Sequence, residues 1–182
     1  MDKQIVDLRN VLLNGRILDI GGGGEGIISR HAGNRVIAID IRKDELLESP
    51  DVGIKIVMDA VDLKFLDNTF DVITCFYSLM YMSEETVEKC LSEAFRVLKP
   101  DGCLLIWDAE MSWNEQSDVF IANLDIALAN ELISTGYGVS WHKGQSHESV
   151  FNVCDKVGFV RIKGEGDGRK FFLRAWKLED EM

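Results

Sequence analysis

The segment 21–26 combines five glycines with one glutamate, and residues of these types side by side point to ligand binding. Gly21, Gly23 and Gly26 fit the pattern G-x-G-x-x-G after a short apolar run, and Asp40 ends the next apolar run. Glycines at such a turn let the backbone approach a ligand, and an acid about 20 residues further on can accept hydrogen bonds from ribose hydroxyl groups. The spacing therefore predicts a site for an adenosine-type ligand, with a purely structural turn as the alternative.

Glu25 bears on which adenosine-type ligand this glycine loop accepts. A dinucleotide would place its pyrophosphate against the loop and the following helix N-terminus, where a carboxylate repels it. S-adenosylmethionine has no phosphate and carries a sulfonium cation, so an acidic loop is compatible with it. An exposed Glu25 that interacts with the helix dipole is equally consistent with the sequence, so this residue alone leaves both interpretations open.

The elements that must position these residues alternate between strand-like and helix-like stretches. We expect strands at 16–20, 35–41, 53–60, 102–110 and at the start of 70–82, and helices at 25–33, 42–50 and 83–100, the last capped by Ser83. Apolar strands alternating with helices predict a parallel sheet covered on both faces, which binds ligands at the carboxyl ends of its strands. The tail 157–178 contains two alternating strands joined by GEGDG, which predicts an antiparallel hairpin.

Length and composition limit the classes to which the chain can belong. At 182 residues we expect one domain, 1–182, and the formal net charge of −11 disfavours nucleic acid as a partner. No apolar run approaches the length of a membrane span, and the start of the chain lacks the pattern of a signal peptide. The four cysteines are widely spaced, which predicts free thiols in a reducing cytoplasm.

Four motifs in sequence order resemble the class I S-adenosylmethionine-dependent methyltransferases, in particular the methyltransferase 11 or UbiE-like small-molecule type. These motifs are ILDIGGGGEG, VIAIDI, VMDAVDLKFLDNTFDVI and AFRVLKPDGCLLIWD, which together cover roughly residues 16–110. The third and fourth are more diagnostic than the glycines and do not belong to the dehydrogenase pattern. The resemblance implies an α/β, Rossmann-like, doubly wound seven-stranded sheet, mostly parallel with an antiparallel last strand, and S-adenosyl-L-methionine as the cofactor.

Nine residues match positions that hold the cofactor in this family: Asp19, Gly21, Gly23, Asp40, Ile41, Asp59, Ala60, Cys75 and Phe76. By the resemblance, the first aspartate would orient the methionine end, the second would bind both ribose hydroxyl groups, and the third would bind the adenine amino group. The isoleucine and the alanine backbone would contact the adenine, and the glycines would pass close beneath the cofactor. The cysteine and the phenylalanine would line the methionine part. The chain departs from the family at Glu25, which stands where the third glycine is usual.

The segment 111–147 is longer than a simple connection, and we expect it to form a cap over the active site. Asn114 or Ser117 would begin a helix that runs to about Ser134 and ends before Gly136. The alternative is an ordinary helix that covers the sheet. Residues 1–14 can supply at most one short helix. We therefore expect a more open site, or one closed by this segment or by the second subunit of a homodimer.

Charge and aromatic residues give the first indication of the methyl acceptor. Residues 100–142 contain seven acids and neither Lys nor Arg, which disfavours phosphorylated acceptors and favours a neutral or amine-bearing small molecule, unless the acids form a solvated helix face. Six aromatic residues nearby could enclose an aromatic or cationic acceptor, although some must belong to the core: Tyr77, Tyr81, Trp107, Trp113, Tyr137 and Trp141.

Methyl transfer from a sulfonium requires placement of the acceptor more than a general base, so the catalytic residues cannot be assigned from a motif. The weak candidates are Tyr81, Asp108 and His142. His142 and His147 are five residues apart with no third ligand evident, so we expect no metal site.

We therefore expect an enzyme, an S-adenosylmethionine-dependent methyltransferase that acts on a small molecule. The alternative is a non-catalytic protein of the same fold that binds S-adenosylmethionine or S-adenosylhomocysteine, which an occluded acceptor pocket would indicate. An NAD-dependent oxidoreductase is disfavoured because the chain lacks a Tyr-x-x-x-Lys pair.

Overall fold

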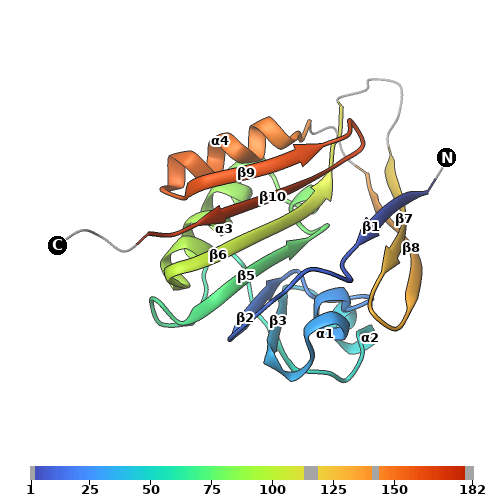
Figure 1. The fold of residues 1–182 in the computed structure, drawn as a ribbon, viewed down its shortest axis with the longest axis horizontal. Helices are drawn as coiled ribbons and strands as arrows, with labels where there is room; N and C mark the ends of the chain where they lie inside the picture. The colour runs from blue at the N-terminus through green and yellow to red at the C-terminus, as the bar shows by residue number, and fades with distance from the viewer. Residues whose placement is uncertain (1–2, 113–118, 141–143, 179–182) are drawn as a thin grey trace.

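The computed structural model describes residues 3–112, 119–140 and 144–178, and its main feature is a seven-stranded sheet (Figure 1). The strands lie in the order β4-β3-β2-β5-β6-β10-β9. Their bounds are β2 (Ile17–Ile20), β3 (Val36–Asp40), β4 (Ile54–Val57), β5 (Phe70–Phe76), β6 (Leu98–Ala109), β9 (Val160–Gly166) and β10 (Lys170–Trp176). β2 to β6 pair in parallel, whereas β10 runs antiparallel to β6 and β9. The predicted sheet with its antiparallel last strand is confirmed.

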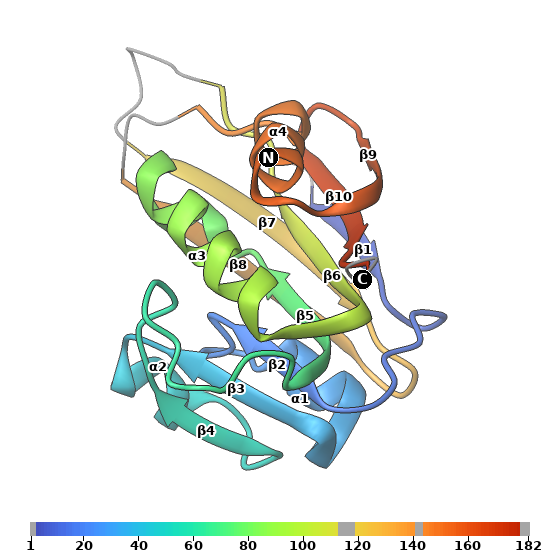
Figure 2. The ribbon, with the colours of Figure 1, turned by 90° about the vertical axis from the view of Figure 1, so that its left-hand side faces the viewer.

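Four helices pack against the two faces of this sheet: α1 (Ile27–Ala32), α2 (Lys43–Glu48), α3 (Glu84–Val97) and α4 (His147–Val157). Residues of α1 and α2 belong to one core cluster, and residues of α3 and α4 belong to the other. Along β6 the side chains alternate between the clusters, because successive residues of a strand point to opposite faces. Figure 2 shows α3 and α4 on one side of β6, with the N-terminal strand on the other.

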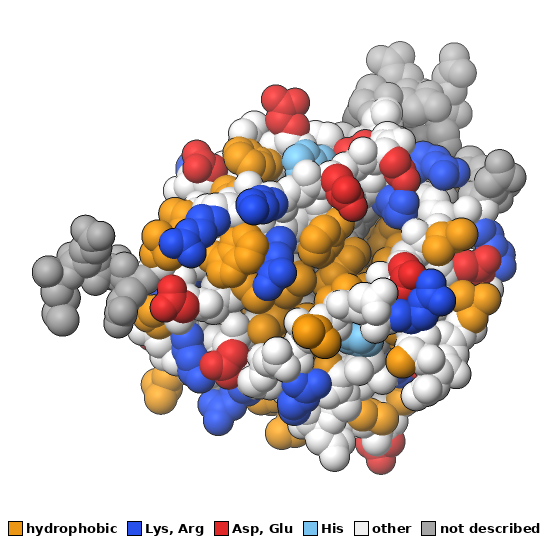
Figure 3. Space-filling view, in the orientation of Figure 1, with side chains coloured by type: hydrophobic (Ala, Val, Ile, Leu, Met, Phe, Trp, Pro, Cys, Tyr) orange, Lys and Arg blue, Asp and Glu red, His pale blue; other side chains and the backbone are white. Residues whose placement is uncertain are grey.

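The face of the sheet opposite α3 and α4 is covered less completely. Figure 3 shows hydrophobic side chains gathered near the middle of this face, over β5, β6 and β10. Phe172 and Trp176 of β10 are only partly buried there, and the guanidinium of Arg174 lies 4.7 Å from the centre of the Trp176 ring. The arginine therefore covers part of the apolar surface with a cation–π contact.

The helix ends follow local sequence signals. Ser83 is the N-cap of α3, as predicted, because its hydroxyl oxygen accepts a hydrogen bond from the Thr86 backbone N–H at 3.1 Å. Ser146 caps α4 in the same way, with the Ser149 N–H at 3.1 Å, and that helix was not expected from the sequence.

The helix expected within 111–147 is wrong, because the described part of this segment forms two strands. β7 (Phe120–Ala127) and β8 (Leu132–Val139) pair as an antiparallel hairpin, and β1 (Gln4–Asp7) adds to β7 in parallel. β1 also replaces the short helix considered for residues 1–14. From Ala122 onward every second residue of β7 is fully buried, which is the period of a strand. β1 provides a pairing partner from over 110 residues away. The expected caps Asn114 and Ser117 lie outside the described residues.

Three further features bear on the classes of site that the sequence suggested. All four cysteines are free, as predicted, and the structure buries all four. Within the described ranges, no helix is both long enough and apolar enough to cross a membrane. The part of the chain that the structure places also contains no group of three or more His, Cys, Asp or Glu side chains suited to a metal ion.

Candidate active site

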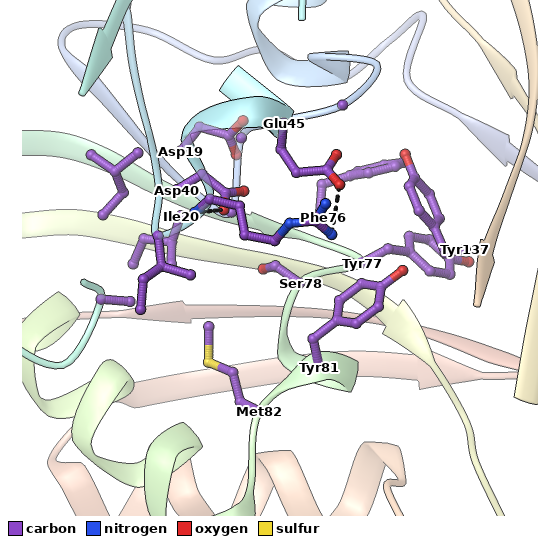
Figure 4. Close-up of a pocket in the computed structure, with 18 of the residues that line it drawn as sticks. Asp19, Ile20, Asp40, Glu45, Phe76, Tyr77, Ser78, Tyr81, Met82 and Tyr137 are labelled. Carbon is purple, nitrogen blue, oxygen red and sulfur yellow. Dashed lines mark hydrogen bonds and ion pairs between the residues drawn. The ribbon is translucent and has the colours of Figure 1, made fainter. Parts of the chain in front are cut away.

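A cavity of about 730 Å³ lies where β2, β3, β4 and β5 end, at the carboxyl edge of the sheet (Figure 4). Eight of the nine residues predicted to hold the cofactor line it: Asp19, Gly21, Gly23, Asp40, Ile41, Asp59, Ala60 and Phe76. These residues lie on segments that span 58 positions of the sequence, from Asp19 to Phe76, and adjacent parallel strands bring them together. The volume of the cavity lies within the range of small-molecule sites.

Cys75 is the exception among the nine. Its side chain is fully buried beside Cys90 in the core cluster that includes residues of α3. Phe76 belongs to the opposite cluster and reaches the cavity. Neighbouring residues of a strand point to opposite faces, so the two could not both line the cavity through their side chains.

Asp19 lies at the base of the cavity and is only 2% exposed. The Thr74 hydroxyl group donates a hydrogen bond to its carboxylate at 2.7 Å. Burial nevertheless raises the pKa of Asp19 to about 7, because the charged form loses water and the single hydrogen bond compensates only in part. A cation bound beside this carboxylate would favour its ionised form.

The glycine loop packs directly against the ends of neighbouring elements. Gly21 has a φ of 74°, and a Cβ there would collide with the side chain of Ser78 after β5. A Cβ at Gly23 would lie 2.5 Å from the Cβ of Glu45 and 2.9 Å from a carboxylate oxygen of Asp40. Glycine is required at both positions, and the loop is thereby held close to the acid at the end of β3.

Glu25 is only partly exposed and does not simply point into solvent, the alternative that its sequence context left open. Its carboxylate lines the cavity and accepts hydrogen bonds from the hydroxyl groups of Thr135 and Tyr137 on β8, the second at 3.0 Å. Sequence reasoning could not find these partners, which lie 110 and 112 residues further along the chain. The acid therefore links the glycine loop to the β7–β8 hairpin.

Three tyrosines form the end of the cavity opposite Asp19 and Asp40 (Figure 4). The rings of Tyr77 and Tyr137 stack with centroids 5.4 Å apart and an interplanar angle of 23°. Tyr81 lies beside them, close to the backbone of Gly138 on β8. Burial raises the pKa of Tyr81 to about 12 and also raises the pKa of the other two, so all three phenols stay protonated at neutral pH.

Two buried hydroxyl groups in the cavity wall have no hydrogen-bond partner among the described residues, those of Tyr77 and Ser78. Ser78 is 6% exposed, and Figure 4 shows its side chain directed into the pocket. A buried hydroxyl without a partner is costly, so its presence indicates that the cavity takes a ligand with polar groups. No sequence motif singled out Ser78.

The residues predicted as catalytic candidates or as aromatic contacts of the acceptor lie in different places. Tyr81 lines the cavity, but Asp108 does not. The Asp108 carboxylate is fully buried and accepts hydrogen bonds from the backbone N–H of Leu79 and Ala109, both at 2.8 Å, and from the Gln145 amide. It thus supports the 3-10 turn Leu79–Tyr81 that carries Tyr81. Trp107 is one of the aromatic residues that belong to the core, whereas Trp113, Trp141 and His142 lie outside the described residues.

The charges around the cavity are strongly unequal. Five acids line it: Asp19, Glu25, Asp40, Glu45 and Asp59. Among the lining residues that the structure describes, Arg42 is the one cation, and it pairs with Asp44 at 2.6 Å and Glu45 at 2.9 Å. No free positive side chain is therefore offered to a phosphate by the described lining residues, whereas a cationic ligand meets an attractive field.

Comparison with known proteins places these residues in a wider context. Residues 18–106 match the family model described as a methyltransferase domain. The chain is 35% identical over 182 residues to the ubiquinone/menaquinone biosynthesis C-methyltransferase UbiE of Idiomarina loihiensis, covering 86% of this chain and 71% of that protein. It is 29% identical over 187 residues to the protein of the same name from Cereibacter sphaeroides, covering 90% and 74%.

Solved structures show the same architecture. One is the crystal structure of an S-adenosylmethionine-dependent methyltransferase from Methanosarcina mazei, with a TM-score of 0.64 and 21% sequence identity. The match covers 94% of this chain and 96% of that one.

Proposed function

Because this chain belongs to the class I S-adenosylmethionine-dependent methyltransferases, we propose that it methylates a small, neutral or amine-bearing molecule. The observation that carries the proposal is the division of one cavity into an acidic end at the glycine loop and an aromatic end formed by three tyrosines. The first end suits the cofactor, and the second suits an uncharged or cationic acceptor.

The residues at the acidic end fit S-adenosylmethionine, which supplies a methyl group activated by its sulfonium when it is bound. Asp19 would face the methionine ammonium group, Asp40 would accept hydrogen bonds from the ribose, and Asp59 would accept one from the adenine. Ile41 is 67% exposed although it lines the cavity, which leaves its side chain free to pack on a flat adenine ring. The paired state of Arg42 argues against a pyrophosphate in the same place.

The aromatic end would place the acceptor and keep water away from it. Tyr77, Tyr81 and Tyr137 are protonated at neutral pH, so each can donate a hydrogen bond but none is ready to act as a base. Such a wall fits an acceptor whose attacking atom already has a free electron pair, such as a neutral amine. The chain would then contribute orientation, which can account for a large part of a rate enhancement.

A ring carbon of an electron-rich aromatic acceptor is the second candidate. Relatives named as ubiquinone/menaquinone biosynthesis C-methyltransferases suggest it, and the stacked pair of Tyr77 and Tyr137 offers a flat surface for an aromatic ring. A non-catalytic role is disfavoured, because the cavity continues beyond the glycine loop to the tyrosines and is not occluded.

Calorimetric titration with S-adenosylmethionine, S-adenosylhomocysteine and NAD tests the cofactor end, on the wild type and on Asp40→Ala. We expect both adenosyl sulfur compounds to bind the wild type, NAD not to bind, and Asp40→Ala to lose most of the affinity. Transfer of a labelled methyl group to a panel of amines, phenols, quinols and phosphorylated amines then tests the acceptor. Transfer to the phosphorylated compounds alone would contradict the proposal.

A further inference from the structure

We propose that Glu25 is a positioning residue that holds Tyr137 against the aromatic end of the cavity, so that β8 determines which acceptors fit. This inference rests on the proposed function, because it assigns the aromatic end to the acceptor. It gives a specific role to the one residue at which the glycine loop departs from the usual family pattern.

The first step of the argument is the pair of hydrogen bonds to the Glu25 carboxylate. One oxygen accepts from the Thr135 hydroxyl group and the other from the Tyr137 hydroxyl group, at 3.0 Å for the tyrosine. Hydrogen bonds to an ionised acceptor are stronger than those between neutral groups. Both donors are on the same side of β8, two positions apart, so the carboxylate fixes the strand at two points.

The second step is the position of the Tyr137 ring. It stacks on Tyr77, which is 2% exposed, and it lines the cavity together with Gly138. Tyr81 and the backbone of Gly138 lie close together in the cavity wall, so β8 also comes near the turn after β5. The strand thus spans the cavity between the glycine loop and that turn.

The third step is that the hairpin itself is held by burial and does not depend on Glu25. Ala122, Leu124 and Ile126 of β7 are all fully buried, and β7 pairs with β1. A salt bridge between Arg30 and Glu131 at 3.2 Å attaches the hairpin turn to α1 outside the cavity. Loss of the Glu25 carboxylate should therefore leave the fold intact and release only the side chains of Thr135 and Tyr137.

The chain contains three tyrosines, and all three line this cavity, which permits a direct test. Protein labelled with 3-fluorotyrosine gives three fluorine NMR signals, assigned with Tyr77→Phe, Tyr81→Phe and Tyr137→Phe. We expect Glu25→Ala to move the Tyr137 signal, and Glu25→Gln to restore it in part, since the amide oxygen still accepts one hydrogen bond. Glu131→Gln, which weakens the attachment outside the cavity, should leave all three signals in place.

Kinetics with the best amine or phenol from the acceptor panel test the consequence. Glu25→Ala and Tyr137→Phe both remove the bond that holds the Tyr137 side chain. The acceptor must then order this side chain when it binds, so its KM should rise about ten-fold and the range of acceptors should broaden. The Kd for S-adenosylhomocysteine should change much less. An unmoved Tyr137 signal in Glu25→Ala, or an equal loss of affinity for acceptor and S-adenosylhomocysteine, would overturn the inference. Failure of the proposed function would give a different result: the wild-type protein would transfer methyl groups to none of the acceptors in the panel.

Discussion

At the scale of single residues, Asp19 combines deep burial with a place in the cavity wall. Its raised pKa, about 7, means that the free protein holds a proton there below neutral pH. The folded state binds more protons than the unfolded chain between about pH 4 and 7, so this group lowers the free energy of unfolding as pH rises through that window. Ionisation of the Asp19 carboxyl group is unfavourable in the free protein, and a cationic ligand bound beside it would make ionisation more favourable.

We predict that affinity for S-adenosylmethionine rises with pH between about 5.5 and 7.5, by up to ten-fold per pH unit below the pKa of Asp19. The bound cation favours the carboxylate, so binding releases a proton. Calorimetry in two buffers with different ionisation enthalpies measures that release directly. Thr74→Val, which removes the hydrogen bond to the carboxylate, should shift the rise to higher pH, and Asp19→Asn should abolish it. A pH-independent affinity would show that Asp19 does not face the cationic group.

The environment of Asp108 indicates a structural role and not a catalytic one. Its carboxylate is fully buried against backbone N–H groups and does not line the cavity. We predict that Asp108→Asn lowers the free energy of unfolding by about 1–3 kcal/mol, because buried N–H donors lose part of their acceptor. Urea unfolding measures this, with the exposed acid substitution Asp51→Asn as the control. If stability is unchanged while methyl transfer is lost, Asp108 has a chemical role after all.

At the scale of elements, the β7–β8 hairpin is where local pattern and final structure diverge. Leu124, Ala127, Leu128 and Leu132 lie at spacings that fit a helix, and this supported the wrong prediction. The structure instead buries alternate residues of β7. In a helix, positions three apart share a face, whereas in a strand they lie on opposite faces, so Ile121 and Leu124 distinguish the two conformations.

We predict that Leu124→Ala lowers the free energy of unfolding by about 2–5 kcal/mol, as expected for a large side chain removed from a packed core. Ile121→Ala should cost much less, because Ile121 is 47% exposed on the same strand. Chemical denaturation of the two variants gives the comparison. Similar losses for both substitutions would argue that they share a buried face, as in the helix.

At the scale of the whole molecule, the cavity has the same sign of charge as the chain, whose net charge is −11. Its described lining carries five acids and one arginine, which is paired. This field favours a cation over a neutral ligand of the same shape. Two statements about partners stay predictions: that the protein does not bind nucleic acid, and that it forms a homodimer.

S-adenosylmethionine and S-adenosylhomocysteine provide a matched pair for measuring this field, since they differ by one methyl group and one positive charge. We predict that raising the salt concentration weakens binding of S-adenosylmethionine several-fold more than binding of S-adenosylhomocysteine, because salt screens charge. Titrations at low and high ionic strength, both at pH 8 where Asp19 is ionised, supply the ratio. An unchanged ratio would mean that the cavity acids do not act on the sulfonium.

The sequence by itself determined the alternating elements of the sheet, the N-cap of α3, the antiparallel last strand and eight of the nine residues that meet at the cavity. The elements and the cap follow from local signals, namely apolar runs, glycines and a capping serine, whereas the cavity residues follow from motifs that resemble a known family. The prediction for Cys75 is wrong for a local reason, because alternate residues of a strand point to opposite faces and Cys75 lies on the face opposite Phe76.

Only the tertiary structure decided what surrounds those residues. The partners of Glu25 lie more than 100 positions away, and β7 is a strand partly because β1 is there to pair with it. Asp108 became a support because the turn after β5 and Gln145 close over its carboxylate. Burial, pKa and hydrogen-bond partners depend on contacts between distant segments, and a local pattern carries no information about which distant segment will arrive.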